Sequence, residues 1–398
     1  MSHFVVSHPV ADLRSGFQAE LWAATHGWSV RLGCADSYSK KESRANMLSA
    51  CKRASKSISP ILCFLFFLPA ICRGQQASEQ IRAATTQLKQ TLSTLKIPDD
   101  LKSSDDTIKV YTDALKVSED ALQSGYIYLA LFRLESNWEA VRAFQYCDSK
   151  SAVEKQGVAA FEKEWQKAGK QVAQKEKLLA SASPRPLPAA VTALIESTRN
   201  QSRPYYDSSK LYGINSTINS GLYYVGSSLA GLDFALFCQQ LRFDQMRPAP
   251  KLRSLEPEIK ELEAATIAAF RNVGAETDQS PFYSTSSNLK AAEEMNRAGR
   301  FSGALLKYLE ASLYFGFINP APQDINRLDS LKQQSESLGK RLTAADRDHS
   351  IGLIYWERAQ VALTRAAAGE ALQLNLRRAS VLLEQVLPRY FKYLGESK

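Results

Sequence analysis

Apolar residues recur every three or four positions through most of this chain, and that spacing restricts its fold more than any other feature. Such a repeat places apolar side chains along one face of an α-helix. From residue 75 onward, we find no convincing run of alternating apolar and polar residues, which is the pattern of a half-buried strand. The first predicted helix shows the repeat in Ile81, Ala84, Leu88, Leu92 and Leu95. We therefore expect an all-α protein with roughly ten antiparallel amphipathic helices.

Clusters of proline and serine divide this helical pattern. The segment RPAPKLR (247–253) is expected to join two helical lobes, one over residues 75–250 and one over residues 251–398. The segment SPFYSTSS (280–287) is expected to be a loop for the same reason. The helices between these breaks are long enough to bury a sizeable core.

The most apolar stretch, ILCFLFFLPAICRG, occupies residues 61–74. It is too short to cross a membrane, because about 30 Å of hydrocarbon requires about 20 apolar residues. Counted from Met47, a basic segment precedes the apolar core, and the small residues Cys72 and Gly74 follow it. This order of basic, apolar and small-residue regions resembles a general secretory signal peptide.

The resemblance implies a division of the N-terminal region. We expect residues 1–46 to be an upstream extension outside the native protein and residues 47–74 to be the signal peptide. The mature chain would then begin at Gln75 and be exported, either to a periplasm or out of the cell. In the alternative, residues 47–74 stay attached as an N-terminal anchor with a short cytoplasmic segment.

The charge of the predicted mature region argues against nucleic acid as a partner. The whole chain has 50 Lys plus Arg and 41 Asp plus Glu, of which residues 1–74 hold nine and four. The remaining 41 basic and 37 acidic residues give a net charge near +4 over 324 residues. No block of Lys and Arg stands out among them, so no electrostatic footprint for nucleic acid is predicted.

Few residues suited to catalysis or metal binding remain in that region. Cys147 and Cys238 either form a disulfide bond, which an exported chain allows, or are two independent buried thiols. His349 follows Asp348 before a predicted amphipathic helix, and an acidic residue there is typical of helix capping. We find no phosphate-binding loop, dinucleotide-binding motif, nucleophile elbow or metal-ligand spacing. We therefore expect no cofactor, no metal and no enzymatic activity.

One predicted helix, residues 219–241, is apolar on two opposite sides. A helix of this kind is usually buried, so we expect it to be the central helix of the first lobe. A stable membrane span is not expected there, because Asp233 and several serines lie within it. Asp233 itself has two interpretations: it binds a ligand or handles a proton, or it pairs with a neighbouring helix.

Tyrosines supply the remaining candidate binding residues. Two adjacent pairs, Tyr205–Tyr206 and Tyr223–Tyr224, are expected either to line a pocket for sugars or peptides or to bridge core and surface. Tyr308, in the second lobe, is a further candidate.

The segment AGRFSGALLKYLEASL (298–313) carries a family resemblance. Its turn and packing positions are Gly299, Phe301, Ala304, Leu305, Tyr308 and Ala311. Their spacing resembles the turn and second helix of a tetratricopeptide repeat, where glycine allows the turn and small residues let the helices pack closely. A weaker copy lies 174 residues earlier, with Gly125 at the turn and Asn137 in place of the last alanine. The resemblance implies helical hairpins near residues 288–313 and 114–137.

The second hairpin departs from the family pattern at its end. Gly316 stands where a proline usually ends the unit, and we expect it to end the helix as a C-cap instead. No further copy follows 34 residues later, so a long superhelical array is not predicted.

These features favour binding over catalysis. We expect a non-catalytic scaffold or adaptor that binds a protein or peptide in a groove between helices. The alternative is a protein that binds a small ligand in the crevice around residues 219–241. An adaptor would show a contiguous exposed apolar groove, whereas a ligand-binding protein would show an enclosed pocket with a few convergent polar groups.

Overall fold

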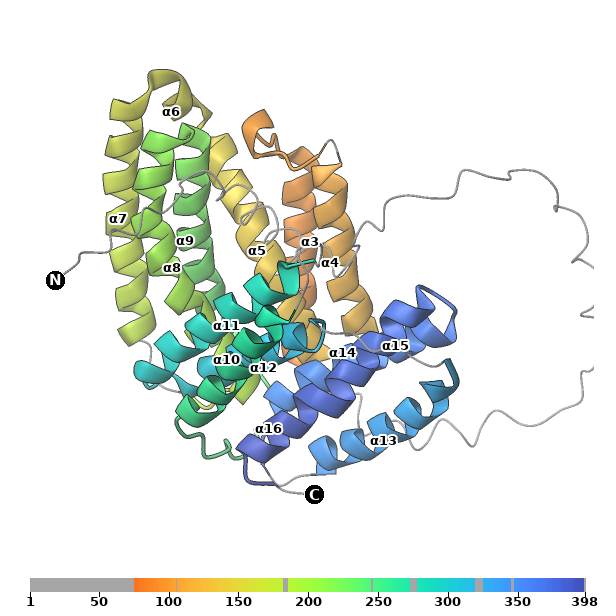
Figure 1. Ribbon diagram of the computed structural model, residues 1–398. Coiled ribbons are helices and arrows are strands. Elements are labelled where there is room, and N and C mark those ends of the chain that lie inside the picture. The colour runs from red at the N-terminus through yellow and green to blue at the C-terminus, as the bar shows by residue number, and fades with distance from the viewer. Residues whose placement is uncertain are drawn as a thin grey trace, which may run out of the picture.

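The computed structural model in Figure 1 is built of packed α-helices. It describes residues 75–104, 106–181, 185–244, 246–272, 278–318, 325–344 and 347–396. No β-strand occurs within these ranges, so the predicted all-α class is confirmed. The predicted signal peptide and upstream extension lie outside the described residues.

The described α-helices are joined by connections of different lengths. In chain order they are α3 (Gln75–Thr94), α4 (Thr107–Gln123), α5 (Ile127–Ser149), α6 (Ser151–Gln156), α7 (Val158–Ser181), α8 (Ala189–Asn215), α9 (Ile218–Gln240), α10 (Glu256–Arg271), α11 (Ser280–Arg297), α12 (Phe301–Phe315), α13 (Leu328–Ala344), α14 (Ser350–Ala367), α15 (Leu372–Val381) and α16 (Leu387–Tyr393). Two 3₁₀ turns, η2 (Asp99–Leu101) and η3 (Ile325–Arg327), and a π-helical segment, η4 (Leu382–Val386), complete them.

The helical repeat in the sequence corresponds to buried faces. All five apolar residues predicted for the first helix, now α3, are buried. Two residues at helix starts are exceptions: Ile108 in α4 is 41% exposed and Val158 in α7 is 45% exposed. The first turn of a helix projects beyond its neighbours, so its apolar side chains are covered less completely.

The helix predicted to be central is α9, and it is buried on nearly all sides. It packs against α5, α7 and α8, and Figure 1 shows α7, α8 and α9 side by side. Among the described residues, α9 is long and apolar enough to cross a membrane by length and composition. However, 78% of its most apolar window is buried by its neighbours. The helical core therefore accounts for its apolar character.

The helices before and after the 247–253 segment share one core. Helix α12 packs against α8, and α14 packs against α5, so buried side chains from both predicted lobes form one connected cluster. The 247–253 segment itself is not helical.

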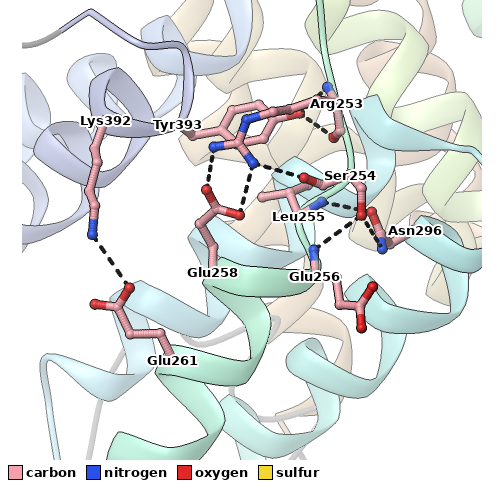
Figure 2. Close-up of polar contacts among 9 residues, drawn as sticks. All are labelled: Arg253, Ser254, Leu255, Glu256, Glu258, Glu261, Asn296, Lys392 and Tyr393. Carbon is pink, nitrogen blue, oxygen red and sulfur yellow. Dashed lines mark hydrogen bonds and ion pairs between the residues drawn. The ribbon is translucent and has the colours of Figure 1, made fainter.

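This connecting segment is fixed to the C-terminal helix, as Figure 2 shows. The Arg253 N–H donates to the Tyr393 hydroxyl at 2.7 Å, and that hydroxyl donates to the Arg253 carbonyl at 2.6 Å. The Arg253 guanidinium lies over the Tyr393 ring at 4.8 Å and pairs with Glu258 of α10. Asn296 of α11 accepts from the Leu255 N–H at 2.8 Å, just before α10 begins. The end of α16 and the start of α10 are therefore held together through one short segment.

Both predicted hairpins are present as antiparallel helix pairs, α4–α5 and α11–α12. Gly125 and Gly299 make their turns with φ of +78° and +70°, the left-handed region that glycine adopts without steric cost. A hairpin of this kind also occurs in helical proteins without tetratricopeptide repeats, so the family resemblance stays a prediction.

The expected loop at 280–287 is wrong, because these residues form the first half of α11. Pro281 lies in the first turn, where no backbone N–H is needed for the helix. Phe282 and Thr285 follow at helical spacing and are buried.

Gly316 is the C-cap of α12, as predicted, but with a right-handed φ of −61°. A Cβ there would meet Val381 Cγ1 at 2.4 Å, so the reason for glycine at this position is close packing rather than a left-handed turn.

Asp348 joins the N-termini of two helices. Its Oδ1 accepts from the Ser350 N–H at 2.8 Å, which is the predicted capping interaction for α14. Its Oδ2 accepts from the Ala189 N–H at 2.5 Å, at the start of α8. The Ser350 hydroxyl in turn accepts from the Ala190 N–H at 2.8 Å. One carboxylate and one hydroxyl therefore hold α8 and α14 end to end.

Candidate functional site

A central cavity lies between the helices that precede and follow the connecting segment. Its volume is about 540 Å³, within the range of small-molecule sites. Residues of α4, α5, α8, α9, α11, α12, α14 and α15 line it. Among the lining residues, Asp113 of α4 and Ser287 of α11 are exposed and mark where the cavity reaches the surface. A shallower hollow beside α3 is lined largely by polar side chains at the surface and lacks a comparable set of buried charges.

One part of the cavity, which we call the arginine end, is formed by Arg133, Arg358, Arg365 and Arg378. These side chains come from three helices, α5, α14 and α15, and all are half-buried. Glu310 of α12 accepts from Arg358 Nη1 at 2.5 Å. Among the described residues, Glu310 is the carboxylate that lies with these guanidiniums. The arginine end therefore carries more positive than negative charge.

The crowding of cations shows in the pKa values of the arginines. Burial, reinforced by the charge of Arg358, lowers the pKa of Arg133 to about 10. Burial, reinforced by Arg133 and Arg358, lowers the pKa of Arg378 to about 9. The Nε of Arg133 is buried and has no hydrogen-bond partner in the described part of the chain. A negatively charged group in the cavity would relieve both the repulsion and the missing hydrogen bond.

A second part of the cavity, which we call the acidic end, is formed by Glu135, Glu139, Tyr205, Tyr223 and Tyr224. The two carboxyl groups lie one turn apart on α5, and the tyrosines come from α8 and α9. The Tyr205 and Tyr224 ring centroids are 5.8 Å apart, and those of Tyr223 and Tyr224 are 6.2 Å apart. The three aromatic rings therefore lie close together, and the charge of Glu139 acts on Tyr223, whereas the charges that act on Glu135 are those of Lys307 and Glu310.

The carboxyl groups of the acidic end hold their protons tightly. Burial, reinforced by the charge of Glu135, raises the pKa of Glu139 to about 8, against the opposing charge of Lys307. Burial likewise raises the pKa of Glu135, although Lys307 acts to lower it. Within the described residues, neither glutamate forms an ion pair with Lys307 or with any other cation.

Asn137 lies between these glutamates in the sequence and also lines the cavity. Its Nδ2 donates to the Arg133 carbonyl at 2.8 Å, which fixes the orientation of the amide. Its Oδ1 is left without a hydrogen-bond partner among the described residues, although the side chain is only 3% exposed. Asn137, which stands in place of the last alanine of the hairpin pattern, therefore contributes an acceptor without a partner beside the cavity.

The structure brings together only some of the residues predicted from the sequence. Tyr223, Tyr224 and Tyr205 line the cavity. Asp233 does not, because its carboxylate pairs with Lys175 of α7 and its side chain is 45% exposed. Tyr308 does not line it either, and is buried elsewhere along α12.

The remaining candidates are buried and lie outside the lining of the cavity. Cys147 and Cys238 are both free and buried, so the alternative of two independent thiols is the one found. His349 is the N-cap residue of α14, with Nδ1 3.0 Å from the Tyr390 hydroxyl, and burial lowers the pKa of its imidazole. Among the described residues, no group of three His, Cys, Asp or Glu side chains is placed to hold a metal ion.

The charged residues of the cavity were not singled out from the sequence. Arg133, Glu135 and Glu139 lie on α5, where charged residues occur on more than one side of an otherwise buried helix. A surface helix keeps its charged residues on one face. Charged residues on more than one side of α5 are therefore the signal in the sequence that could have indicated a buried charged site. Their partners on α12, α14 and α15 come from distant parts of the chain, and no spacing rule connects them.

Comparison with protein families, curated proteins and solved structures finds no match for this chain. The chemistry of the cavity therefore has to be derived from its own residues. A hollow of this size with buried cations, carboxyl groups and aromatic rings is suited to binding a small polar molecule.

Proposed function

We propose that this protein binds a small organic molecule through an anionic group held at the arginine end of the central cavity. The observation that carries the proposal is the gathering of four arginines in the lining of a cavity of about 540 Å³, where Arg358 pairs with Glu310 and the charges of the other arginines act on one another. Guanidinium groups recognise carboxylate and phosphate well, because their planar donors match the geometry of these anions.

The arginine end favours an anion on energetic grounds. Burying like charges together is costly unless a counter-charge is present. Glu310 offsets part of the charge of Arg358, but the Nε of Arg133 still lacks a partner in the described region. A carboxylate or phosphate that enters the cavity would supply both the charge and the acceptor.

The cavity favours the small-ligand alternative over the predicted adaptor. It is a partly open hollow between helices, and it has the convergent polar groups expected of a ligand-binding protein. We propose a non-catalytic binding role, exported if residues 47–74 act as a signal peptide. A protein or peptide partner stays a prediction from the sequence.

The test is calorimetric titration of the purified protein with three probes of equal length: hexanoate, hexyl phosphate and hexanol. We expect at least one of the two anions to bind and hexanol to bind far more weakly. Arg133→Gln and Arg365→Gln should each weaken anion binding roughly tenfold, which corresponds to one lost charged hydrogen bond. Arg297→Gln is the matched control, because Arg297 is a surface arginine, 71% exposed.

Two results would overturn the proposal. One is binding of hexanol as tightly as the anions, which would show that charge is not recognised. The other is failure of both anions to bind the wild-type protein, or equal loss of binding in the Arg297→Gln control.

A further inference from the structure

The acidic end of the cavity has features that an anion-binding site alone does not require. Glu135 and Glu139 are directed to the same cavity as the arginines and have no ion-pair partner among the described residues. A solitary anion would be repelled by either carboxyl group once that group is ionised. Their presence points to a second recognised group on the ligand.

The surroundings of these carboxyl groups match a cation. The faces of tyrosine rings attract ammonium groups within about 6 Å, and an ammonium group beside Glu135 and Glu139 would favour their ionised forms, which add a counter-charge. Burial is the main cause of the raised pKa of the Tyr223 hydroxyl. Glu139 lies close enough for its charge to raise that pKa further.

We infer that the ligand is a linear zwitterion, with its acidic group at the arginine end and its ammonium group at the acidic end. This inference rests on the proposed anion binding and adds the second recognised group. Glu135, Glu139 and the rings of Tyr205, Tyr223 and Tyr224 would bind the ammonium group.

The two ends of the cavity are separated along α5. Arg133 and Glu139 are six residues apart on α5, which is about 9 Å along the helix axis. Amino acids with the amine at the far end of a short alkyl chain, such as 6-aminohexanoate and 8-aminooctanoate, span comparable distances. An α-amino acid with a short side chain would hold both charges too close together to reach both ends.

The experiment compares 6-aminohexanoate with hexanoate, adipate and 1,6-diaminohexane, and 8-aminooctanoate with octanoate, by calorimetry on the wild-type protein. Within each chain length, the probes differ only in the groups at their ends. We expect at least one amino acid to bind roughly tenfold or more tightly than the monoacid of its length. Adipate and the diamine should bind more weakly than 6-aminohexanoate.

Variants then test whether the acidic end is responsible for the tighter binding of the amino acid. Glu139→Gln and Tyr205→Leu should each lower the ratio of the amino acid's affinity to that of hexanoate, whereas a surface variant should leave this ratio unchanged. Glu293→Gln on the surface of α11 is the control for loss of a carboxylate, since its side chain is 45% exposed. Two variants of different chemistry are used so that misfolding of one does not remove the test.

The outcomes separate the two proposals. If the monoacids bind but no amino acid binds more tightly, the zwitterion is wrong and anion binding stands. If the diamine binds as tightly as 6-aminohexanoate, the zwitterion is also wrong, because the arginine end then plays no part. If no anion binds at all, both proposals fail.

Discussion

The Glu357 carboxyl group accepts a 2.7 Å hydrogen bond from the backbone N–H of Leu129, a residue 228 positions earlier in the chain. Glu357 belongs to α14, and Leu129 lies in the first turn of α5, four residues after the turn glycine Gly125. The second hairpin repeats this arrangement, because Glu196 of α8 accepts from the Gly303 N–H at 2.6 Å, four residues after Gly299. Each hairpin is therefore capped by a glutamate from a helix distant in sequence.

The first prediction concerns this cap. Glu357→Ala should lower the free energy of unfolding by about 1–3 kcal/mol, because the buried Leu129 N–H loses its acceptor. Glu357→Gln should lose much less at pH 6, because its amide oxygen can still accept the bond and the pKa of Glu357, raised by burial to about 8, keeps the native carboxyl largely neutral there. Urea unfolding at pH 6 measures both values. Equal losses in the two variants would contradict the capping role.

A second prediction concerns pH and Glu139. Its pKa in the folded protein is raised to about 8 from an ordinary value of 4.5, chiefly by burial, so the folded state binds the proton more tightly than the unfolded state. The stability from this protonation is fully present below pH 4.5 and is lost as the pH rises through about 8. Glu139→Gln removes the group whose ionisation causes this loss of stability. Without ligand, the variant should therefore be more stable than wild type at pH 9 by about 1–3 kcal/mol.

The measurement is thermal unfolding of wild type and Glu139→Gln from pH 5 to pH 9. The difference between them isolates Glu139 from Glu135 and Glu357, which titrate in both proteins. A difference that stays constant across this range would show that Glu139 has an ordinary pKa in the fold.

A third prediction distinguishes two reasons why a position is occupied by glycine, namely close helix packing and a positive φ. A Cβ on Gly226 of α9 would lie 2.8 Å from the Cα of Ala143 on α5, so Gly226→Ala should cost about 1–3 kcal/mol by forcing the helices apart. Gly125→Ala has open space around it but a φ of +78°, and should cost about 1–2 kcal/mol through backbone strain. Asparagine adopts that backbone region more readily, so Gly125→Asn should be milder than Gly125→Ala, whereas Gly226→Asn should be worse than Gly226→Ala. Unfolding curves that reverse this order would refute the distinction.

The fourth prediction tests the junction at Asp348. Asp348→Ala removes the acceptor for the backbone N–H groups of both Ala189 and Ser350, and should cost about 1–3 kcal/mol. Native-state hydrogen exchange should show faster exchange of both amides, although they lie in different helices. Ser350→Ala, by comparison, should affect the Ala190 amide alone. Acceleration confined to α14 after Asp348→Ala would show that the contact with α8 contributes nothing.

The last prediction concerns Asp233, whose role the sequence left open. Its ion pair with Lys175 lies near the surface, and pairs of this kind contribute about 0–1 kcal/mol. Asp233→Asn should therefore change the unfolding free energy by less than about 1 kcal/mol and leave ligand binding intact. A folded Asp233→Asn protein that no longer binds 6-aminohexanoate, in a preparation where wild type does, would restore Asp233 as a binding residue.

The sequence by itself determined the helical class, the buried character of α9 and the two glycine turns. These follow from local rules: apolar spacing sets which face of a helix is buried, and a residue with positive φ is most easily a glycine. Asp348 as a cap for α14 was likewise predictable, because the acceptor and the N–H of Ser350 are neighbours in the chain. Where local rules competed, as at Pro281, the tolerance of proline in a first helical turn decided in favour of the helix.

The tertiary structure alone decided the cavity and its charges. Arg133 and Arg358 lie near Glu310 only because α5 packs against α14 and side chains of α14 reach α12, and nothing in their spacing along the chain specifies that arrangement. The same holds for Asp348 and Ala189, and for Glu357 and Leu129, whose bonds join helices far apart in sequence. Helix formation depends on near neighbours, whereas the relative placement of helices depends on how whole surfaces fit. Only that placement brings separate charges into one site.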